Sequence, residues 1–344
     1  MINFRKLTSA LISVIFLLLL VFTACRSFPL YPEQSNALNI KNKGPQPTYR
    51  EMVTVPGKII KGSGKDGVFI EGRTVTLSSF KIAKYQTTWE LWNEVYTWSV
   101  PNGYNFPALN GLAWQGHEAV NVNPGTGTSN PNFGWNPEQK KVRPVTFINW
   151  RDIVVWCNAY SEMSGLQPVY IDDNGNTIKD SSIRVEVFTF QDISRNGYRL
   201  PTEAEWEFAA RGGNPDRKMV WNFTWPGSMN FAQVAWGRGT PASVTGGSNF
   251  GANPVGTKLP NTLDLYDMAG NIAELVWDSA NEVVPGEVKD PIEPGGEQLT
   301  DNRVRRGGGF ITPPDWSTVS YRNEPFGING RNQYVGFRVA AKAE

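Results

Sequence analysis

The sequence predicts an α+β domain with much irregular structure, for three reasons. The chain of 344 residues contains 34 Gly and 24 Pro, which interrupt regular elements. Few stretches show a helical period, although those few have strong boundary residues. Aromatic residues make up 12% of the chain and include 13 Trp, so the protein has ample apolar surface to bury.

The first 24 residues are typical of an export signal. Arg5 and Lys6 precede an apolar run at residues 11–21 that is short for a membrane span. The following Phe-Thr-Ala-Cys25 resembles a bacterial lipobox. We therefore expect cleavage after residue 24 and diacylation of Cys25, with the acyl chains as the membrane anchor. The alternative is an ordinary cleaved signal with an incidental cysteine.

Residues 25–50, rich in Pro, Asn, Lys and Gln, predict a flexible tether. One domain over residues 51–344 follows, so the expected location is the bacterial envelope, at the outer membrane or cell surface. The net charge of +1 gives no support for nucleic-acid binding.

The first elements expected along the domain are a strand at residues 52–57 that ends in a turn and a second strand at residues 73–82. Residues 85–89 are then expected to lead into a helical stretch through Val95. A second helix begins at Asn149, where Asp152 completes a capping box, and ends at Gly165. Its apolar positions recur at helical spacing and include Cys157. Cys157 is therefore predicted to be an inert core thiol.

A strand–turn–strand element is expected next, with strands at 168–171 and 183–190 around the turn Asp172–Asn176. Residues 101–137 show no period and predict a long loop or insertion. His117, the one histidine of the sequence, lies in this loop and is expected to be a solvated surface residue.

The best-defined helix starts after Pro201. Thr202 is positioned to accept from the amide of Glu205, whose side chain reaches back to the amide of Thr202. Gly212 and Gly213 provide the left-handed stop. The carboxylates of Glu203 and Glu207, one helical turn apart, are interpreted as part of a solvated face and cap.

This helix and four other blocks resemble the formylglycine-generating-enzyme, or sulfatase-modifying-factor, family. The blocks are Arg199–Gly213, Tyr266-Asp-Met-Ala-Gly-Asn-Ile-Ala-Glu274, Trp277-Asp278, Arg303-Val-Arg-Arg-Gly-Gly-Gly-Phe310 and Gly336-Phe-Arg-Val-Ala340. The resemblance implies a C-type-lectin-like fold, with a small twisted antiparallel sheet, two main helices and much irregular structure.

The resemblance also implies where the catalytic thiols of the family would lie. Counted from the Gly-Gly-Gly-Phe block, these positions are occupied by Thr312 and Ser317, and no cysteine follows Cys157. A hydroxyl does not replace a thiolate as a ligand of Cu(I). We therefore expect no bound copper and a catalytically silent domain. The alternative is a family enzyme with cysteine-independent chemistry in periplasmic protein maturation.

A calcium site is implied by the same resemblance. Its ligands would be the side chains of Asp267 and Glu274 and the backbone carbonyls of Gly270 and Ile272, all oxygen donors that suit Ca²⁺. The alternative is a tight turn stabilised by hydrogen bonds of Asn271.

The residues 307–337, here called the C-terminal segment, have the composition of a binding surface, with Trp, Tyr, Ser, Asn, Gly and Arg predominating. The alternative is that Trp316, Tyr321 and Phe326 are core residues. The chain also resembles one group of cysteine-less lipoproteins in this family, the variable proteins of diversity-generating retroelements, such as those of treponemes. In those proteins the segment that corresponds to residues 307–337 is diversified.

That resemblance implies a protein or other macromolecular ligand at the cell surface. Its expected contacts are Thr312, Asp315, Trp316, Ser317, Tyr321, Asn323, Asn329, Asn332 and Tyr334. The expected scaffold includes Arg306, Arg322 and Arg338.

Overall fold

The computed structural model describes residues 49–107, 142–172, 174–182, 190–191, 194–243, 250–292 and 302–343. All of them belong to one structural unit, Thr48–Glu344. The predicted signal, Cys25 and His117 lie outside the described residues, as does nearly all of the predicted tether. No helix among the described residues has the length and apolarity that crossing a membrane requires.

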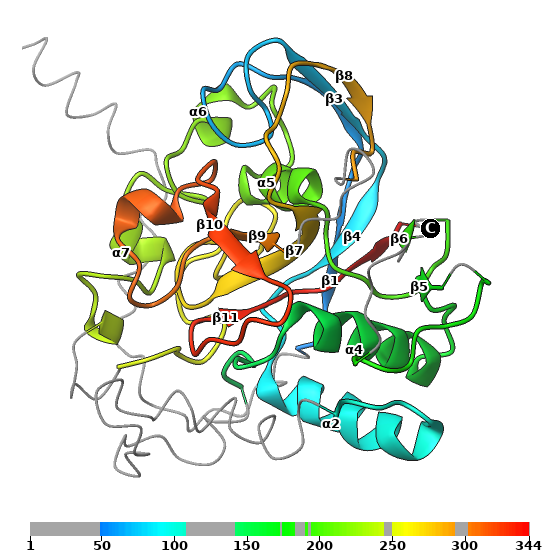
Figure 1. Ribbon diagram of the computed structural model, residues 1–344. Helices are drawn as coiled ribbons and strands as arrows, with labels where there is room; N and C mark the ends of the chain where they lie inside the picture. The colour runs from blue at the N-terminus through cyan, green and yellow to red at the C-terminus, as the bar shows by residue number, and fades with distance from the viewer. Residues whose placement is uncertain are drawn as a thin grey trace, which may run out of the picture. The chain divides into compact units, whose positions relative to one another are not determined.

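The sheets of the domain are small; two of them lie in its middle and a third lies at its edge (Figure 1). An antiparallel sheet has the order β1-β4-β12, and a four-stranded sheet has the order β10-β9-β7-β11, with β11 parallel to β7. A third sheet has the order β2-β3-β8, and β5 pairs with β6. The strands are β1 (Met52–Val55), β2 (Lys58–Lys61), β3 (Arg73–Leu77), β4 (Phe80–Ala83), β5 (Tyr170–Ile171), β6 (Phe190–Gln191), β7 (Ala273–Ser279), β8 (Gly286–Lys289), β9 (Asn302–Arg306), β10 (Asn323–Gly327), β11 (Val335–Gly336) and β12 (Ala340–Lys342).

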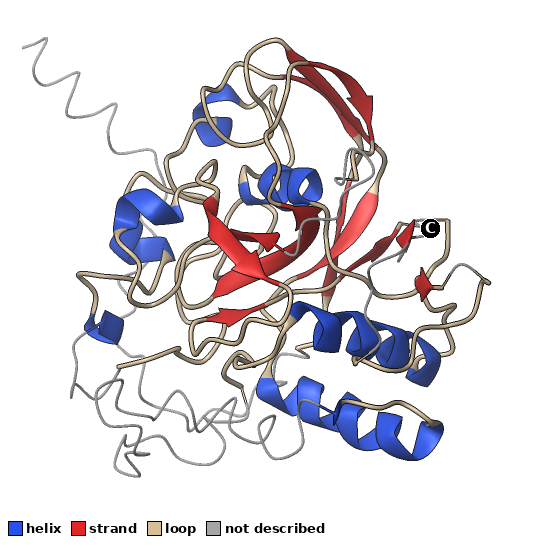
Figure 2. Cartoon of the chain, in the orientation of Figure 1, coloured by secondary structure: helices blue, strands red, loops and turns tan. Residues whose placement is uncertain are grey.

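Two longer helices lie side by side, and loops connect most of the remaining elements (Figure 2). The helices are α2 (Trp89–Ser99), α4 (Trp150–Met163), α5 (Glu203–Ala210), α6 (Lys218–Trp221) and α7 (Phe231–Val234), with 3-10 turns η1 (Val100–Asn102), η5 (Pro241–Ser243) and η6 (Pro314–Ser317). This arrangement confirms the predicted α+β class, with small sheets and two main helices.

The helix boundaries agree with the sequence where local chemistry sets them. Both predicted capping boxes are present, at Asn149–Asp152 and at Thr202–Glu205. Gly212 and Gly213 have φ values of 85° and 65°, the left-handed stop that was expected. The helix predicted to end near residue 95 continues to Ser99.

One predicted strand is divided into two. Residues 73–82 form β3 and β4 because the chain turns at Ser78 and Ser79. Ser78 donates from both its amide and its hydroxyl to Asp290, and the hydroxyl of Ser79 accepts from the amide of Gly57. These side-chain hydrogen bonds hold a bend that strand periodicity does not reveal.

The core contains stacked aromatic rings between α2, α4 and the sheets. The rings of Trp92 and Trp156 lie parallel, with centroids 5.4 Å apart, and Phe337 meets both edge-on. Cys157 is fully buried in this cluster, and burial raises the pKa of its thiol well above the usual range. The prediction of a core thiol is confirmed.

Candidate functional site

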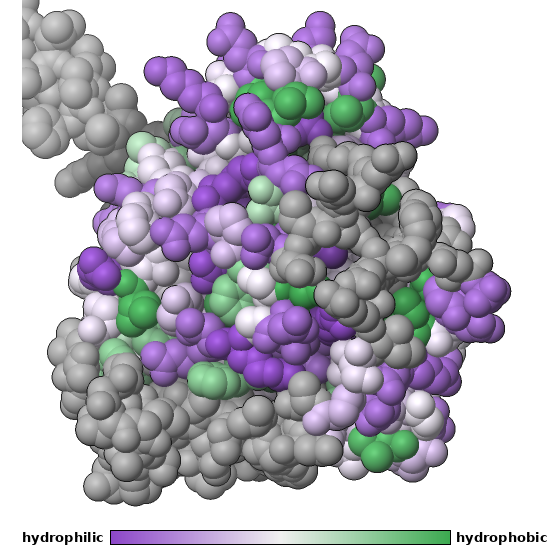
Figure 3. Space-filling model, in the orientation of Figure 1, coloured by the Kyte–Doolittle hydropathy of each residue, from purple (hydrophilic) through white to green (hydrophobic). Residues whose placement is uncertain are grey.

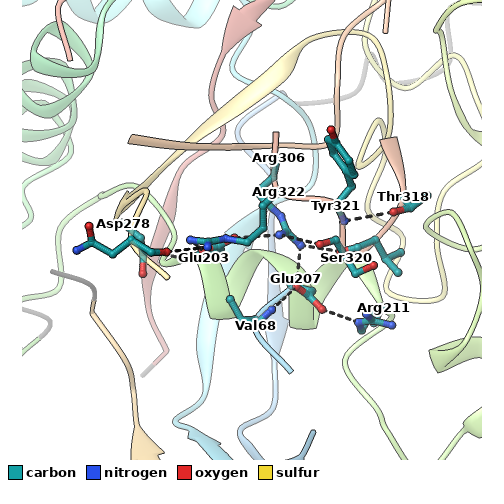
Figure 4. Close-up of polar contacts among 12 residues, drawn as sticks. Val68, Glu203, Glu207, Arg211, Asp278, Arg306, Thr318, Ser320, Tyr321 and Arg322 are labelled. Atoms are coloured by element: carbon teal, nitrogen blue, oxygen red, sulfur yellow. Dashed lines mark hydrogen bonds and ion pairs between the residues drawn. The ribbon is translucent and has the colours of Figure 1, made fainter. Parts of the chain in front are cut away.

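Buried ion pairs join α5 to β9 and the C-terminal segment. Arg306, at the end of β9, donates from Nη1 to Glu203 Oε1 at 2.9 Å and from Nη2 to Glu207 Oε2 at 2.7 Å. Arg322 donates from Nε and Nη2 to the two oxygens of Glu203, each at 2.8 Å. Figure 4 shows both guanidinium groups directed at the helix that carries the two carboxylates. Glu203 and Glu207 are buried, so their interpretation as a solvated face was wrong.

The same arginines hold the backbone of the C-terminal segment. Arg306 also donates to the carbonyl oxygens of Val319, at 2.7 Å, and Ser320, at 3.3 Å. Arg322 donates from Nη1 to the carbonyl of Asn281 at 2.7 Å. Because the contacts at 319 and 320 are made to carbonyl groups, they do not depend on which side chains the segment carries there.

A second contact holds the later part of the segment. Arg331 forms an ion pair from Nη2 to Asp152 Oδ2 at 2.6 Å, and its Nη1 donates to the carbonyl of Phe147 at 3.0 Å. Asp152 belongs to the capping box of α4, just as Glu203 is the first residue of α5. Both main attachment points of the segment are therefore carboxylates in the first turn of a helix, where the dipole also favours negative charge.

Arg338 completes this set, which we call the framework arginines: Arg306, Arg322, Arg331 and Arg338. Its Nε and Nη2 donate to the two oxygens of Glu274, each at 2.7 Å, and both residues are buried. Sequence reasoning assigned three of the four to the scaffold and missed Arg331.

Thr312 and Ser317, which the resemblance places where the family's thiols would be, lie close together in this structure. A Cβ atom added to Gly308 would lie 2.4 Å from Ser317 Oγ and 2.9 Å from Thr312 Cγ2, so the two side chains meet over this glycine. Both hydroxyls are engaged, because Thr312 Oγ1 accepts from the amide of Gly309 at 2.8 Å and Ser317 donates to the carbonyl of Pro313 at 3.4 Å. The local arrangement brings two hydroxyls together and holds them in backbone hydrogen bonds.

A pocket of about 160 Å³ opens beside this pair. Five expected ligand contacts line it: Thr312, Trp316, Tyr321, Asn323 and Tyr334. The rings of Trp316 and Tyr321 lie parallel within 2°, with centroids 6.0 Å apart. Trp316 is 48% exposed, so it is not the core residue that the alternative reading required. An exposed Trp whose ring stacks on a second aromatic ring suits a contact surface.

The other four expected contacts lie elsewhere. Asp315 and Asn329 are exposed but do not line the pocket. Ser317 is buried below it. Asn332 supports a turn, since its Oδ1 accepts from the amide of Tyr334 at 3.2 Å and its carbonyl accepts from the amide of Phe147 at 3.1 Å. Polarity in the sequence does not distinguish a side chain that supports a turn from one that faces a ligand.

Sequence reasoning missed the remaining lining residues: Arg238, Ala273, Arg305, Ile311, Pro313 and Glu324. Three of these, Arg238, Ala273 and Arg305, precede the C-terminal segment. The sequence contained a pattern that could have indicated Arg305, because this residue belongs to the Arg-rich block before the glycines. No pattern in the residues around Arg238 indicated a role in a site.

The loop proposed for calcium is occupied by protein hydrogen bonds. The Nε2 of Gln86 lies 3.1 Å from the carbonyl oxygens of Asp267 and Ile272 and 2.9 Å from Glu274 Oε1. The other oxygen of Glu274 accepts from Trp206 Nε1 at 2.7 Å, in addition to the ion pair with Arg338. An amide nitrogen therefore lies among the oxygens that would face an ion.

In this arrangement the residues do not fit calcium, because Glu274 is already paired with a guanidinium group. Asp267 has one oxygen bonded to the amide of Gly256 and the other without a hydrogen bond, and burial raises its pKa to about 6. Asn271, as the alternative reading expected, bonds the turn through Asn253 and Gln86. Calcium therefore stays an expectation from the resemblance alone, and the hydrogen bonds of this loop favour the alternative, a turn held without the ion.

The outer surface is mostly hydrophilic on the face that Figure 3 shows, with small separated hydrophobic areas. No group of three or more His, Cys, Asp or Glu side chains with metal-binding geometry occurs within the described ranges. The pocket beside Thr312 and Ser317 is accordingly the candidate functional site, since it combines the exposed ring of Trp316 with two arginines next to a segment that buried ion pairs hold.

Comparison with known proteins agrees with this architecture. A family model described as the sulfatase-modifying factor enzyme 1-like domain matches residues 39–343. Chaperone protein LppX of Paenibacillus barcinonensis is 30% identical over 304 residues, covering 84% of this chain and 88% of that protein. The formylglycine-generating enzyme of Thermomonospora curvata is 28% identical over 346 residues, covering 88% and 97%.

Among solved structures, Treponema denticola variable protein 1 superposes with a TM-score of 0.60 at 26% identity, covering 85% of this chain and 95% of that one. The relatives include an inactive member, the inactive C-alpha-formylglycine-generating enzyme 2 of Mus musculus, at 33% identity over 43% of this chain and 44% of that protein. The family thus contains active and inactive proteins. With nearly the whole described domain inside the family match, the chain belongs to the sulfatase-modifying factor enzyme 1-like family.

Proposed function

We propose that this protein is an envelope lipoprotein, attached through diacylated Cys25, that binds a protein or other macromolecular ligand with a catalytically silent domain. The observation that carries the proposal is the pocket of the C-terminal segment. There the half-exposed Trp316 and its stacked partner Tyr321 stand beside two hydroxyls at the positions of the family's thiols.

The two hydroxyls support the proposal that this domain lacks the family's oxidation chemistry. Neither Thr312 nor Ser317 supplies a soft thiolate for copper, and the buried thiol of Cys157 packs in the aromatic core instead. Incubation of the purified protein with cysteine-containing peptides and copper should yield no formylglycine by mass spectrometry. Formylglycine produced above the level of a heat-denatured control would restore the enzyme alternative.

The framework supports a binding surface that can change while the fold stays the same. The segment is held by the framework arginines, largely through carboxylates outside it and its own carbonyl groups. Side chains lining the pocket contribute few of these contacts. Likeness to a structure named a variable protein supports diversification of this segment by a retroelement.

Sequencing of the gene in a clonal population and in related isolates tests that part of the proposal. We expect substitutions in the codons for Thr312, Trp316, Tyr321, Asn323 and Tyr334, confined to positions at which at least one copy of the gene carries adenine, with the framework codons unchanged. Uniform codons throughout the segment would exclude diversification and leave a binding protein of constant specificity.

A chaperone role is the second candidate, favoured by the 30% identity with chaperone protein LppX across most of both chains. It uses the same surface in a different way, because a chaperone binds unfolded clients. Suppression of the aggregation of a chemically unfolded model protein, lost in Trp316→Ala, would support this role. Binding to folded ligands only would argue against it.

A further inference from the structure

The two arginines of the pocket do not belong to the C-terminal segment. Arg238 lies between α7 and η5, and Arg305 lies on β9. A segment that changes its side chains would therefore leave both arginines in place. The pocket combines a constant part, outside residues 307–337, with a part that the segment supplies.

Both guanidinium groups are held in position and retain donors for a ligand. Arg305 donates from Nε and Nη2 to the carbonyl of Glu324, at 3.1 and 2.9 Å, and its guanidinium lies 4.9 Å from the ring centre of Phe326. Arg238 is exposed and donates from Nε to the carbonyl of Ile311 at 3.3 Å. Among the described residues, neither arginine forms an ion pair with a carboxylate.

The charge of the lining favours a singly charged anion. Two arginines face one acidic residue, Glu324, whose side chain is exposed and forms no ion pair with either of them among the described residues. A guanidinium group matches a carboxylate in shape and charge. The carboxylate of Glu324 would repel a doubly charged phosphate more strongly than a single carboxylate.

The volume limits how much of a ligand enters. Cavities of about 150 Å³ hold a molecule the size of benzene, and this pocket has about 160 Å³. One side chain therefore fills it, and the rest of the ligand must contact the surface around it. The exposed Trp316 provides such a surface, because tryptophan is enriched in protein interfaces and often contributes much of their binding energy.

Building on the proposed binding function, we propose that Arg238 and Arg305 form a constant cationic subsite for an Asp or Glu side chain of a protein ligand. The side chains of the C-terminal segment then select the residues around that carboxylate. Changing the segment changes which acidic epitope is bound, and the requirement for the acidic residue remains.

The test uses a phage-displayed library of random peptides selected on the full chain. The same selection is made on a chain whose Thr312, Tyr321 and Asn323 are all changed to Ser. We expect Asp or Glu to be enriched in both sets of peptides, with different residues around it. Replacing that acidic residue by its amide in a synthetic peptide should weaken binding at least about tenfold, as for loss of a charged hydrogen bond.

Variants of the protein complete the test. Arg238→Gln should weaken binding of the acidic peptide by a similar factor, Arg238→Lys should recover part of it, and Arg217→Gln, at an exposed arginine outside the pocket, should change nothing. Trp316→Ala reports on the binding surface separately. Peptides that need Trp316 but show no acidic preference would overturn the cationic subsite and leave the proposed function intact.

Other outcomes are equally decisive. Peptides whose binding is unaffected by Trp316→Ala would contradict the proposed function itself. Acidic oligosaccharides that bind through Arg238, with no peptide enriched, would overturn the assignment of a protein ligand. Competition by inorganic phosphate at concentrations that acetate does not match would overturn the preference for a carboxylate.

Discussion

Replacing Arg306 by Met should destabilise the domain far more than the same change at Arg322. Arg306 is completely buried and neutralises two buried carboxylates, whereas the side chain of Arg322 is 24% exposed and shares Glu203 with Arg306. Removing one partner of a buried ion pair costs about 3–5 kcal/mol. Loss of Arg306 also leaves the carbonyl of Val319 without its donor.

For Arg322→Met the expected loss is about 1 kcal/mol, because the buried Glu203 keeps Arg306 and the partly exposed guanidinium of Arg322 is screened by solvent. The difference of about 3 kcal/mol is a large share of the 5–15 kcal/mol that stabilises a typical domain. Arg306→Lys should lie between the two variants, since one ammonium group does not bond both carboxylates in the way a guanidinium does.

Urea unfolding followed by tryptophan fluorescence measures these free energies, with Arg217→Met as the control at an exposed arginine. If Arg306→Met does not fold, Arg306→Lys and Glu207→Gln still allow the ranking to be measured. Equal losses for Arg306→Met and Arg322→Met would refute the reasoning that complete burial of Arg306 between two buried carboxylates makes its ion pairs the stronger ones.

Three other predictions follow from the same structure. Cys157 should resist iodoacetamide at pH 8 in the native protein and react after unfolding in urea, because burial raises its pKa and excludes the reagent; rapid native labelling would contradict its place in the core. Growth with a palmitate analogue should label the wild type and not Cys25→Ala, and equal labelling of the two would rule out acylation at Cys25. EGTA should leave the melting temperature unchanged, and a fall with EGTA that calcium reverses would show that the loop binds the ion. The variant Gln86→Ala should lose about 2–4 kcal/mol of unfolding free energy, because several buried oxygens lose their hydrogen-bond donor.

Features determined by neighbouring residues were predictable from the sequence. The capping boxes of α4 and α5 are pairs three residues apart, and the stop at Gly212 and Gly213 requires only a positive φ. Cys157 was placed in the core by helical periodicity alone. For these elements local hydrogen bonding and apolar spacing contain most of the information.

Features that depend on distant partners were not predictable in this way. Glu203 and Glu207 have the spacing of a solvated helix face. Their buried ion-pair partner, Arg306, lies 103 residues after Glu203 in the sequence. Gln86 meets Asp267, Ile272 and Glu274 from a strand–helix connection far earlier in the chain. A charged residue is buried only if the fold places an oppositely charged partner beside it. The periodicity of the sequence around that residue does not show whether such a partner exists.

The candidate site shows the same division. The aromatic and polar composition of the C-terminal segment indicated a binding surface, and five of its nine expected contacts line the pocket. Arg238 comes from a loop with no distinguishing pattern, and it joins the site through hydrogen bonds to the backbone of Ile311 and Thr312. Its role is visible only when the two segments are seen together.

The separation between framework and ligand surface can be measured most directly with two displayed libraries. One randomises Thr312, Trp316, Tyr321, Asn323 and Tyr334, and the other randomises the four framework arginines and Gly308. Resistance to protease reports folding in each. We predict that most members of the first library remain resistant and that most members of the second do not. Equal loss in both would contradict the account, because the pocket residues would then be required for the fold rather than for a ligand.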